Sequence, residues 1–123
     1  MDNELKELIE QYKKIAISSG KAIVSPNNKI LARDRNKKKR LLVQMRSKGN
    51  EALQALIFLL DHENEFIRFA AANTLFKKDS KKALKVLQTI IDTSEKGFLV
   101  GHAEMALDIF QNYPEEINDE FLF

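Results

Sequence analysis

The chain has 123 residues with a net charge of +2, and 44% of them are apolar and 31% charged. This length and balance predict one folded domain with a modest core rather than a disordered chain. Because cysteine is absent, disulfides, thiolate metal sites and cysteine nucleophiles are excluded. No stretch approaches the roughly 18 apolar residues of a membrane-spanning helix. The acidic start has no apolar segment typical of a secretory signal, so we expect a cytoplasmic protein with no membrane contact.

The first element predicted is an amphipathic helix. Apolar residues recur at spacings of three and four from Leu5 to Ala16, as on one face of a helix. We expect Asp2 or Asn3 to cap this helix and Ser18-Ser19-Gly20 to end it. The following Ala22-Ile23-Val24 is compatible with the start of a second helix or with an extended connector.

A strongly basic second helix is predicted over about residues 27–48, with Gly49 ending it and Asn50 capping the next helix. Nine lysines and arginines lie between Lys29 and Lys48, against a single acid, Asp34. The middle of this helix, residues 33–40, is almost wholly charged. Such a segment must be solvated or must face a partner.

Four shorter helices are predicted after it. The third, about residues 51–60, is apolar nearly all round, so we expect it to be covered on more than one side. The fourth follows a short polar turn, with Asn64 as its cap and Ile67, Ala71 and Leu75 on its packing face. The fifth spans about residues 81–92 and the sixth about residues 98–112. Pro114 ends the sixth helix before an acidic tail, residues 114–123.

The last four helices contain a sequence repeat. The fourth and sixth helices correspond at an offset of 32 residues, and the third and fifth at an offset of 31. The matched positions are Ile67, Ala71 and Leu75 with Leu99, Ala103 and Leu107, and Leu56, Leu59 and Leu60 with Leu87, Ile90 and Ile91. A period in the low thirties with two helices per unit is typical of an α-solenoid. We therefore predict an all-α fold of six helices in three stacked antiparallel hairpins, forming one domain over residues 1–123.

The middle hairpin carries a family resemblance. The segment Leu56–Asp61, then Phe66–Ala71 and Leu75, resembles a HEAT repeat of the armadillo type: a leucine-rich helix, an Asp at the turn, and an apolar residue before Arg68. From Tyr12 onward the chain resembles a bacterial family of short HEAT-like domains. The resemblance implies a small right-handed α-α superhelix with no assigned activity, and it supplies no functional residues.

The basic second helix is the main candidate for function. In a solenoid the second helix of each hairpin lines the concave side, and Arg33, Lys37 and Arg40 share one face of this helix. The candidate partner-binding residues are Arg33, Arg35, Lys37, Lys38, Lys39 and Arg40. Such a surface suits an acidic protein partner or, alternatively, a nucleic-acid backbone; a merely solvated helix face is the third possibility. Interleaved aromatic residues for base stacking are absent from the run.

We identify no catalytic, cofactor-binding or metal-binding residues in the sequence. The run from Asp61 to Glu65 has no glycine for a calcium loop and is predicted to be a capped polar turn. The resemblance to HEAT-like units implies that Arg68 pairs with the acid of the turn, here Asp61, or with neighbouring carbonyls. The acidic tail could cover the last repeat, dock on the basic helix of the same or another chain, or fray. Together these features predict a non-catalytic protein-interaction module, acting as an adaptor or a neutralising partner.

Overall fold

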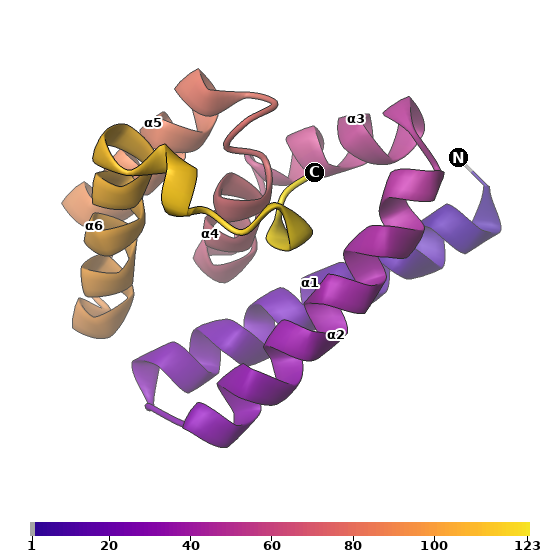
Figure 1. Ribbon diagram of the computed structural model, residues 1–123. Helices are drawn as coiled ribbons and strands as arrows, with labels where there is room; N and C mark the ends of the chain where they lie inside the picture. Colours follow the sequence, from indigo (N-terminus) through magenta and orange to yellow (C-terminus); the bar gives the residue numbers. More distant parts are fainter. Residues whose placement is uncertain (1) are drawn as a thin grey trace.

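The computed structural model describes residues 2–123, which form six α-helices and no strand (Figure 1). The helices are α1 (Asn3–Val24), α2 (Asn28–Ser47), α3 (Asn50–Leu59), α4 (Glu65–Thr74), α5 (Ser80–Thr93) and α6 (Gly97–Asn112). Two short 3-10 turns, η1 (Pro114–Glu116) and η2 (Asp119–Phe121), follow α6. Neighbouring helices pack in pairs, which confirms the predicted α-α repeat arrangement. Within the described residues, no helix has both the length and the apolar character needed to cross a membrane.

The first helix is longer than the sequence predicts. It continues through Ser18-Ser19-Gly20 to Val24, so the prediction that these three residues end it is wrong. The hydroxyls of Ser18 and Ser19 hydrogen-bond Asp34 on α2. Gly20 faces α4, where a methyl group in its place would lie 2.3 Å from the ring of Phe66. The small polar triplet is therefore a helix–helix contact, and glycine permits the close approach of α1 and α4.

The other helix boundaries follow their local signals closely. Asn64 accepts from the backbone N–H of Phe66 at 2.8 Å and caps α4 as predicted. Asp79 caps α5 by accepting from the N–H of Lys82 at 3.3 Å. Asn50 is not a cap but the first residue of α3. The cap position belongs to Gly49, whose φ of 66° suits glycine best.

The core lies where α1 packs against α2, α4 and α6, with α5 closing the last hairpin (Figure 1). Most of the positions that define the repeat are buried in it; the buried members are Leu56, Leu59, Leu60, Ile67, Ala71, Leu75, Leu87, Ile90, Leu99 and Ala103. Helix α3 is less covered than predicted. Phe58 is 78% exposed, because α3 lies at the edge of the stack and presents one side to solvent (Figure 1).

Candidate functional site

The charged middle of α2 is divided between two sides of the helix. Lys37 and Arg40 line a groove between α2 and α1. Arg35, Lys38 and Lys39 face the C-terminal segment, by which we mean residues 113–123. The six predicted site residues therefore do not form one surface.

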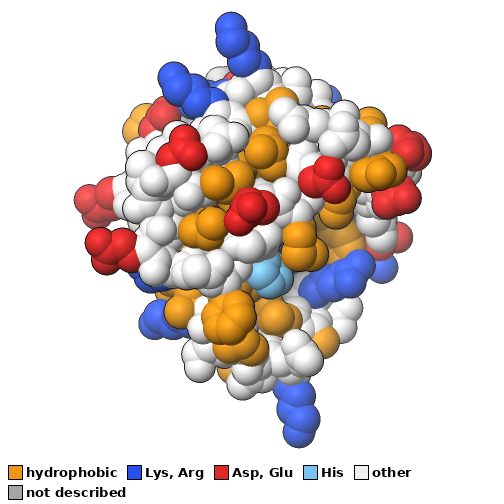
Figure 2. Space-filling model, turned by 90° about the vertical axis from the view of Figure 1, so that its left-hand side faces the viewer, with side chains coloured by type: hydrophobic (Ala, Val, Ile, Leu, Met, Phe, Trp, Pro, Cys, Tyr) orange, Lys and Arg blue, Asp and Glu red, His pale blue; other side chains and the backbone are white. Residues whose placement is uncertain are grey.

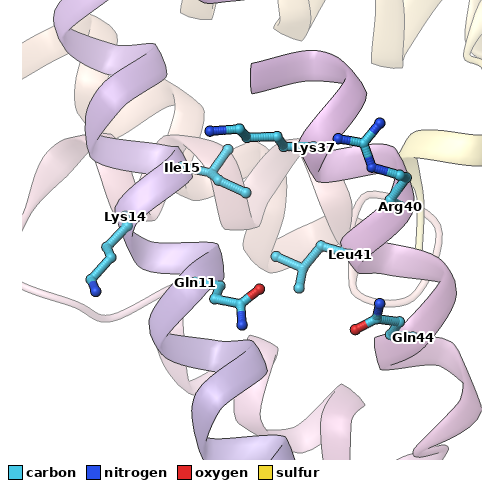
Figure 3. A pocket seen from close by; sticks show the side chains of 7 residues that line it. All are labelled: Gln11, Lys14, Ile15, Lys37, Arg40, Leu41 and Gln44. Atoms are coloured by element: carbon cyan, nitrogen blue, oxygen red, sulfur yellow. The ribbon is translucent and has the colours of Figure 1, made fainter. Parts of the chain in front are cut away.

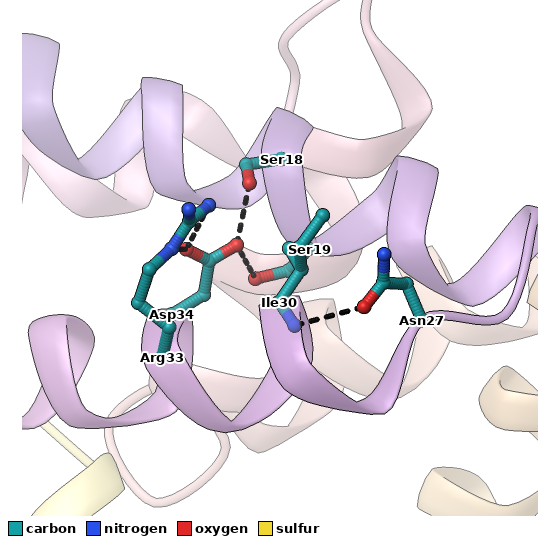
Figure 4. A network of polar contacts seen from close by, with 6 residues as sticks. All are labelled: Ser18, Ser19, Asn27, Ile30, Arg33 and Asp34. Carbon is teal, nitrogen blue, oxygen red and sulfur yellow. Dashed lines mark hydrogen bonds and ion pairs between the residues drawn. The ribbon is translucent and has the colours of Figure 1, made fainter.

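A buried carboxylate fixes α2 against α1. The side chain of Asp34 is only 2% exposed, and it accepts hydrogen bonds from Ser18 Oγ at 2.6 Å and from Ser19 Oγ at 3.2 Å (Figure 4). Arg33, one of the predicted site residues, donates from Nε to the other carboxylate oxygen at 3.4 Å. The expectation that residues 33–40 are wholly solvated or partner-facing is thus wrong for Asp34, because its hydrogen-bond partners lie on α1.

The α1–α2 groove has a volume of about 390 Å³. It is lined by Gln11, Lys14, Ile15, Lys37, Arg40, Leu41 and Gln44. Figure 3 shows Gln11 and Leu41 pointing into the space between the two helices, while Lys37 extends from α2 towards α1. The buried Leu41 and the half-buried Ile15 give the groove an apolar floor.

The cations around this groove lack acidic partners. Within residues 2–123, Lys14, Lys37 and Arg40 form no ion pair, whereas several other lysines do. The paired lysines outside the groove include Lys48 with Glu4 at 2.9 Å, Lys82 with Asp61 at 2.7 Å and Lys96 with Glu65 at 2.6 Å. Unpaired cations beside an apolar floor give the groove a local positive potential although the net charge of the chain is small.

The opposite side of α2 is covered by the C-terminal segment, which runs from α6 past α4 to α2 (Figure 1). Arg46 donates to the backbone carbonyls of Glu120 at 2.8 Å and Leu122 at 2.7 Å. Lys39 forms an ion pair with Glu120, and the guanidinium of Arg35 lies 4.8 Å from the centre of the Phe121 ring. Of the three possibilities for the acidic tail, the structure shows docking on the basic helix of the same chain.

Lys38 and Tyr12 meet beneath this segment. The Lys38 ammonium lies 5.8 Å from the centre of the Tyr12 ring, and burial lowers the pKa of Lys38 to about 8. Burial also raises the pKa of Tyr12. Both shifts have the same cause, since a buried environment disfavours the charged form of either group.

Arg68 and the polar turn have structural roles. Arg68 donates from Nη1 to the carbonyls of His62 at 2.8 Å and Glu63 at 2.9 Å. Of the two partners expected for Arg68, the neighbouring carbonyls are confirmed and Asp61 is not, since Asp61 pairs with Lys82. In the described part of the chain, no three His, Asp or Glu side chains gather closely enough to hold a metal ion.

Some residues of these surfaces escape prediction from the sequence. Lys14 and Gln11 belong to α1, and their only signal is that they flank the apolar stripe at Ile15. Arg46 is the main contact of the C-terminal segment, yet in the sequence it is one basic residue among nine. All three residues lie against an element that is distant in the sequence: Lys14 and Gln11 against α2, and Arg46 against the C-terminal segment.

The face of the molecule formed by α6 has a different character. Phe98 and Met105 are each 61% exposed on α6, and Tyr113, just beyond it, is 48% exposed. Figure 2 shows hydrophobic side chains running down this face with Asp and Glu among them, while Lys and Arg stand mostly at its margins. The positive charge of the groove is therefore not a general property of the surface.

Six α-helices that pack in neighbouring pairs define an α-α helical repeat protein. In agreement with this class, a family model described as HEAT repeats matches residues 29–108, which is more than half of the chain. The chain belongs to the HEAT-repeat family, whose members are in general protein-interaction modules. Searches of curated proteins and of solved structures returned no match. The matched range excludes α1, and with it Lys14, as well as the C-terminal segment.

Proposed function

We propose that this protein is a non-catalytic binding module that takes an acidic protein surface in the α1–α2 groove, as an adaptor or a neutralising partner does. The observation that carries the proposal is the set of three unpaired cations, Lys14, Lys37 and Arg40, around the floor formed by Ile15 and Leu41.

The chemistry of the groove suits carboxylates on an apolar background. The planar guanidinium of Arg40 can bind a carboxylate through two parallel hydrogen bonds, while Lys14 and Lys37 act as point charges. A positive groove of this kind also steers an acidic partner during encounter. A neighbouring hollow of about 580 Å³ shares Lys14 and adds Lys21, so the basic surface continues along α1.

The test is a crosslinking experiment with a matched charge control. A photo-crosslinking residue replaces Gln44 in the groove, and the captured partner is identified by mass spectrometry. We expect Lys37→Glu/Arg40→Glu to weaken its binding by about tenfold or more, since close charge pairs at interfaces contribute more than 1.4 kcal/mol. The control is Lys81→Glu/Lys85→Glu on α5, which makes the same change in net charge outside the groove and should leave the affinity unchanged.

Two results would contradict the proposal. The first is equal loss of binding in the groove and control variants, which would show that only net charge matters. The second is binding of a random DNA duplex that falls steeply with salt and disappears in Lys37→Glu/Arg40→Glu. That second result would favour a nucleic-acid partner instead.

A further inference from the structure

The C-terminal segment packs against α2 and α6. It lies between α2, α4 and α6, the second helices of the three hairpins (Figure 1). A hollow of about 310 Å³ remains beside it, lined by Arg35 and Lys38 of α2, Asn73 of α4, Ile109 of α6 and Phe121 of the segment itself. We call this space, with the segment in it, the concave groove.

Many of the hydrogen bonds that fix the C-terminal segment are made to its backbone and not to its side chains. Arg46 binds the carbonyls of Asp119, Glu120 and Leu122, and the N–H of Phe123 donates to the Thr74 carbonyl at 2.9 Å. Backbone contacts of this kind accept any peptide that follows the same path.

The side-chain contacts add a definite pattern. Asp119 pairs with Lys77 at 2.8 Å, and Glu120 pairs with Lys39. Phe121 lies over Arg35, and Leu122 is buried with 4% of its surface exposed. The groove therefore recognises two acids, an aromatic ring and a buried aliphatic side chain in succession.

From this pattern we infer that the concave groove is a peptide-binding site for an acidic segment of a partner protein that carries an aromatic residue, and that the C-terminal segment is its built-in competitor. Except for Leu122 the segment has no fully buried side chain, and it contains no α-helix. Its two ion pairs are exposed, with 82% of Asp119 and 52% of Glu120 open to solvent, and such pairs add little stability. The segment competes well chiefly because it is covalently attached, which gives it a high effective concentration at the groove. A partner peptide must bind tightly enough to overcome this effective concentration.

This site is separate from the α1–α2 groove, because the two use opposite sides of α2. Lys39 and Arg35 contact the segment, whereas Lys37 and Arg40 line the other groove. A negative result for the α1–α2 groove would therefore not contradict the inference about the concave groove. A negative result for the concave groove would likewise not contradict the proposed function.

The probe is a fluorescein-labelled peptide with the sequence of residues 114–123, added to the full chain and followed by fluorescence anisotropy. In the variant Asp119→Lys/Glu120→Lys the chain's own segment loses both ion pairs, while the groove keeps its residues. We expect the peptide to bind this variant about three- to fivefold more tightly than the unmodified chain, because the loss of two exposed ion pairs weakens the competitor only moderately. Adding Lys39→Glu should abolish the gain, and adding Lys37→Glu/Arg40→Glu should leave it unchanged.

Folding of each variant is checked by circular dichroism, and Asp119→Ala/Glu120→Ala serves as a milder second variant. The inference is overturned if the folded variants bind the peptide no more tightly than the unmodified chain does, or if Lys39→Glu has no effect. Concentration-dependent dimers of the unmodified chain in sedimentation velocity, abolished by the same Lys39→Glu change, would also overturn it, since the occupant would then be a second copy.

Discussion

The phenolic oxygen of Tyr12 lies 2.7 Å from Oγ1 of Thr74, and both side chains are almost completely buried. The Thr74 hydroxyl donates to the Ala70 carbonyl at 3.0 Å, so Tyr12 is the donor in their shared bond. The backbone carbonyl of Thr74 accepts from the N–H of Phe123 at 2.9 Å. One residue at the end of α4 thus joins the first helix to the last residue of the chain.

Replacing Tyr12 with Phe should lower the free energy of unfolding by about 1–2 kcal/mol, since it removes one buried hydrogen bond and leaves the ring in place. Urea denaturation followed by circular dichroism measures the change. Tyr113→Phe is the control, because Tyr113 is 48% exposed and should shift stability by less than about 0.5 kcal/mol. Equal effects at the two positions would mean that the bond between Tyr12 and Thr74 contributes nothing.

The stability of the protein should rise as pH increases from about 8 towards 10. Lys38 has a pKa of about 8 in the folded chain against 10.5 for an exposed lysine. Between these values the unfolded chain binds a proton that the folded chain has released, so alkalinity favours folding. Above pH 10 Tyr12 acts in the opposite direction. Its raised pKa keeps the folded phenol protonated while the unfolded one ionises, so stability falls again.

The variant Lys38→Met separates the two contributions. It keeps an unbranched side chain over Tyr12 and removes the titrating group. We expect greater stability than the unmodified chain at pH 7 and no rise between pH 8 and 10, while the fall above pH 10 remains. Urea denaturation at a series of pH values gives the comparison. A rise that persists in this variant would show that another group causes it.

Two glycines inside helices should respond in opposite directions to alanine. At Gly20 the added methyl group would meet the Phe66 Cβ at 2.7 Å as well as its ring, so we expect destabilisation of about 1–3 kcal/mol by overpacking. At Gly101 nothing lies within 4 Å, and alanine should stabilise α6 by roughly 0.5–1 kcal/mol through its higher helix propensity. Thermal unfolding of both variants is sufficient. Stabilisation by Gly20→Ala would contradict the close approach of α1 and α4.

The C-terminal segment should open before the six helices unfold, because Leu122 is its one fully buried side chain in the described structure. Removing this anchor by Leu122→Ala should destabilise the docked segment by about 2–5 kcal/mol, as the loss of other buried leucines does. Hydrogen exchange measures the change, and we expect protection to fall near the C-terminus while α1 to α6 keep theirs. An equal loss of protection in all six helices would show instead that the segment and the helices unfold as one unit.

The sequence contains enough local information to predict the helices and their pairing. Caps such as Asn64, the apolar spacing in α4 and the offset that matches Ile67 to Leu99 all depend on neighbours in the chain. Ser18-Ser19-Gly20 shows where local information ends. The same three residues can stop a helix or contact another helix, and here Asp34 and Phe66, on other elements, decide between the two.

The candidate surfaces were predictable only in part. The clustering of cations on α2 identifies the helix, but it does not show that Lys37 and Lys39 serve different grooves. That division follows from the positions of α1 and the C-terminal segment around α2. No spacing rule links Arg46 to the carbonyl of Leu122, because their contact depends on the path of the chain through all three hairpins.

The docked C-terminal segment also bears on how such a protein can change in evolution. Open solenoids lengthen by duplicating a hairpin, because each unit contacts only its neighbours. Here the segment after α6 reaches back to α2, and its length matches a stack of three hairpins. An extra hairpin would move α6 away by about one helix spacing or more, roughly 8–10 Å. The contact between Arg46 and Leu122 would then be lost. The docking of the C-terminal segment on α2 therefore fixes the number of hairpins in the stack.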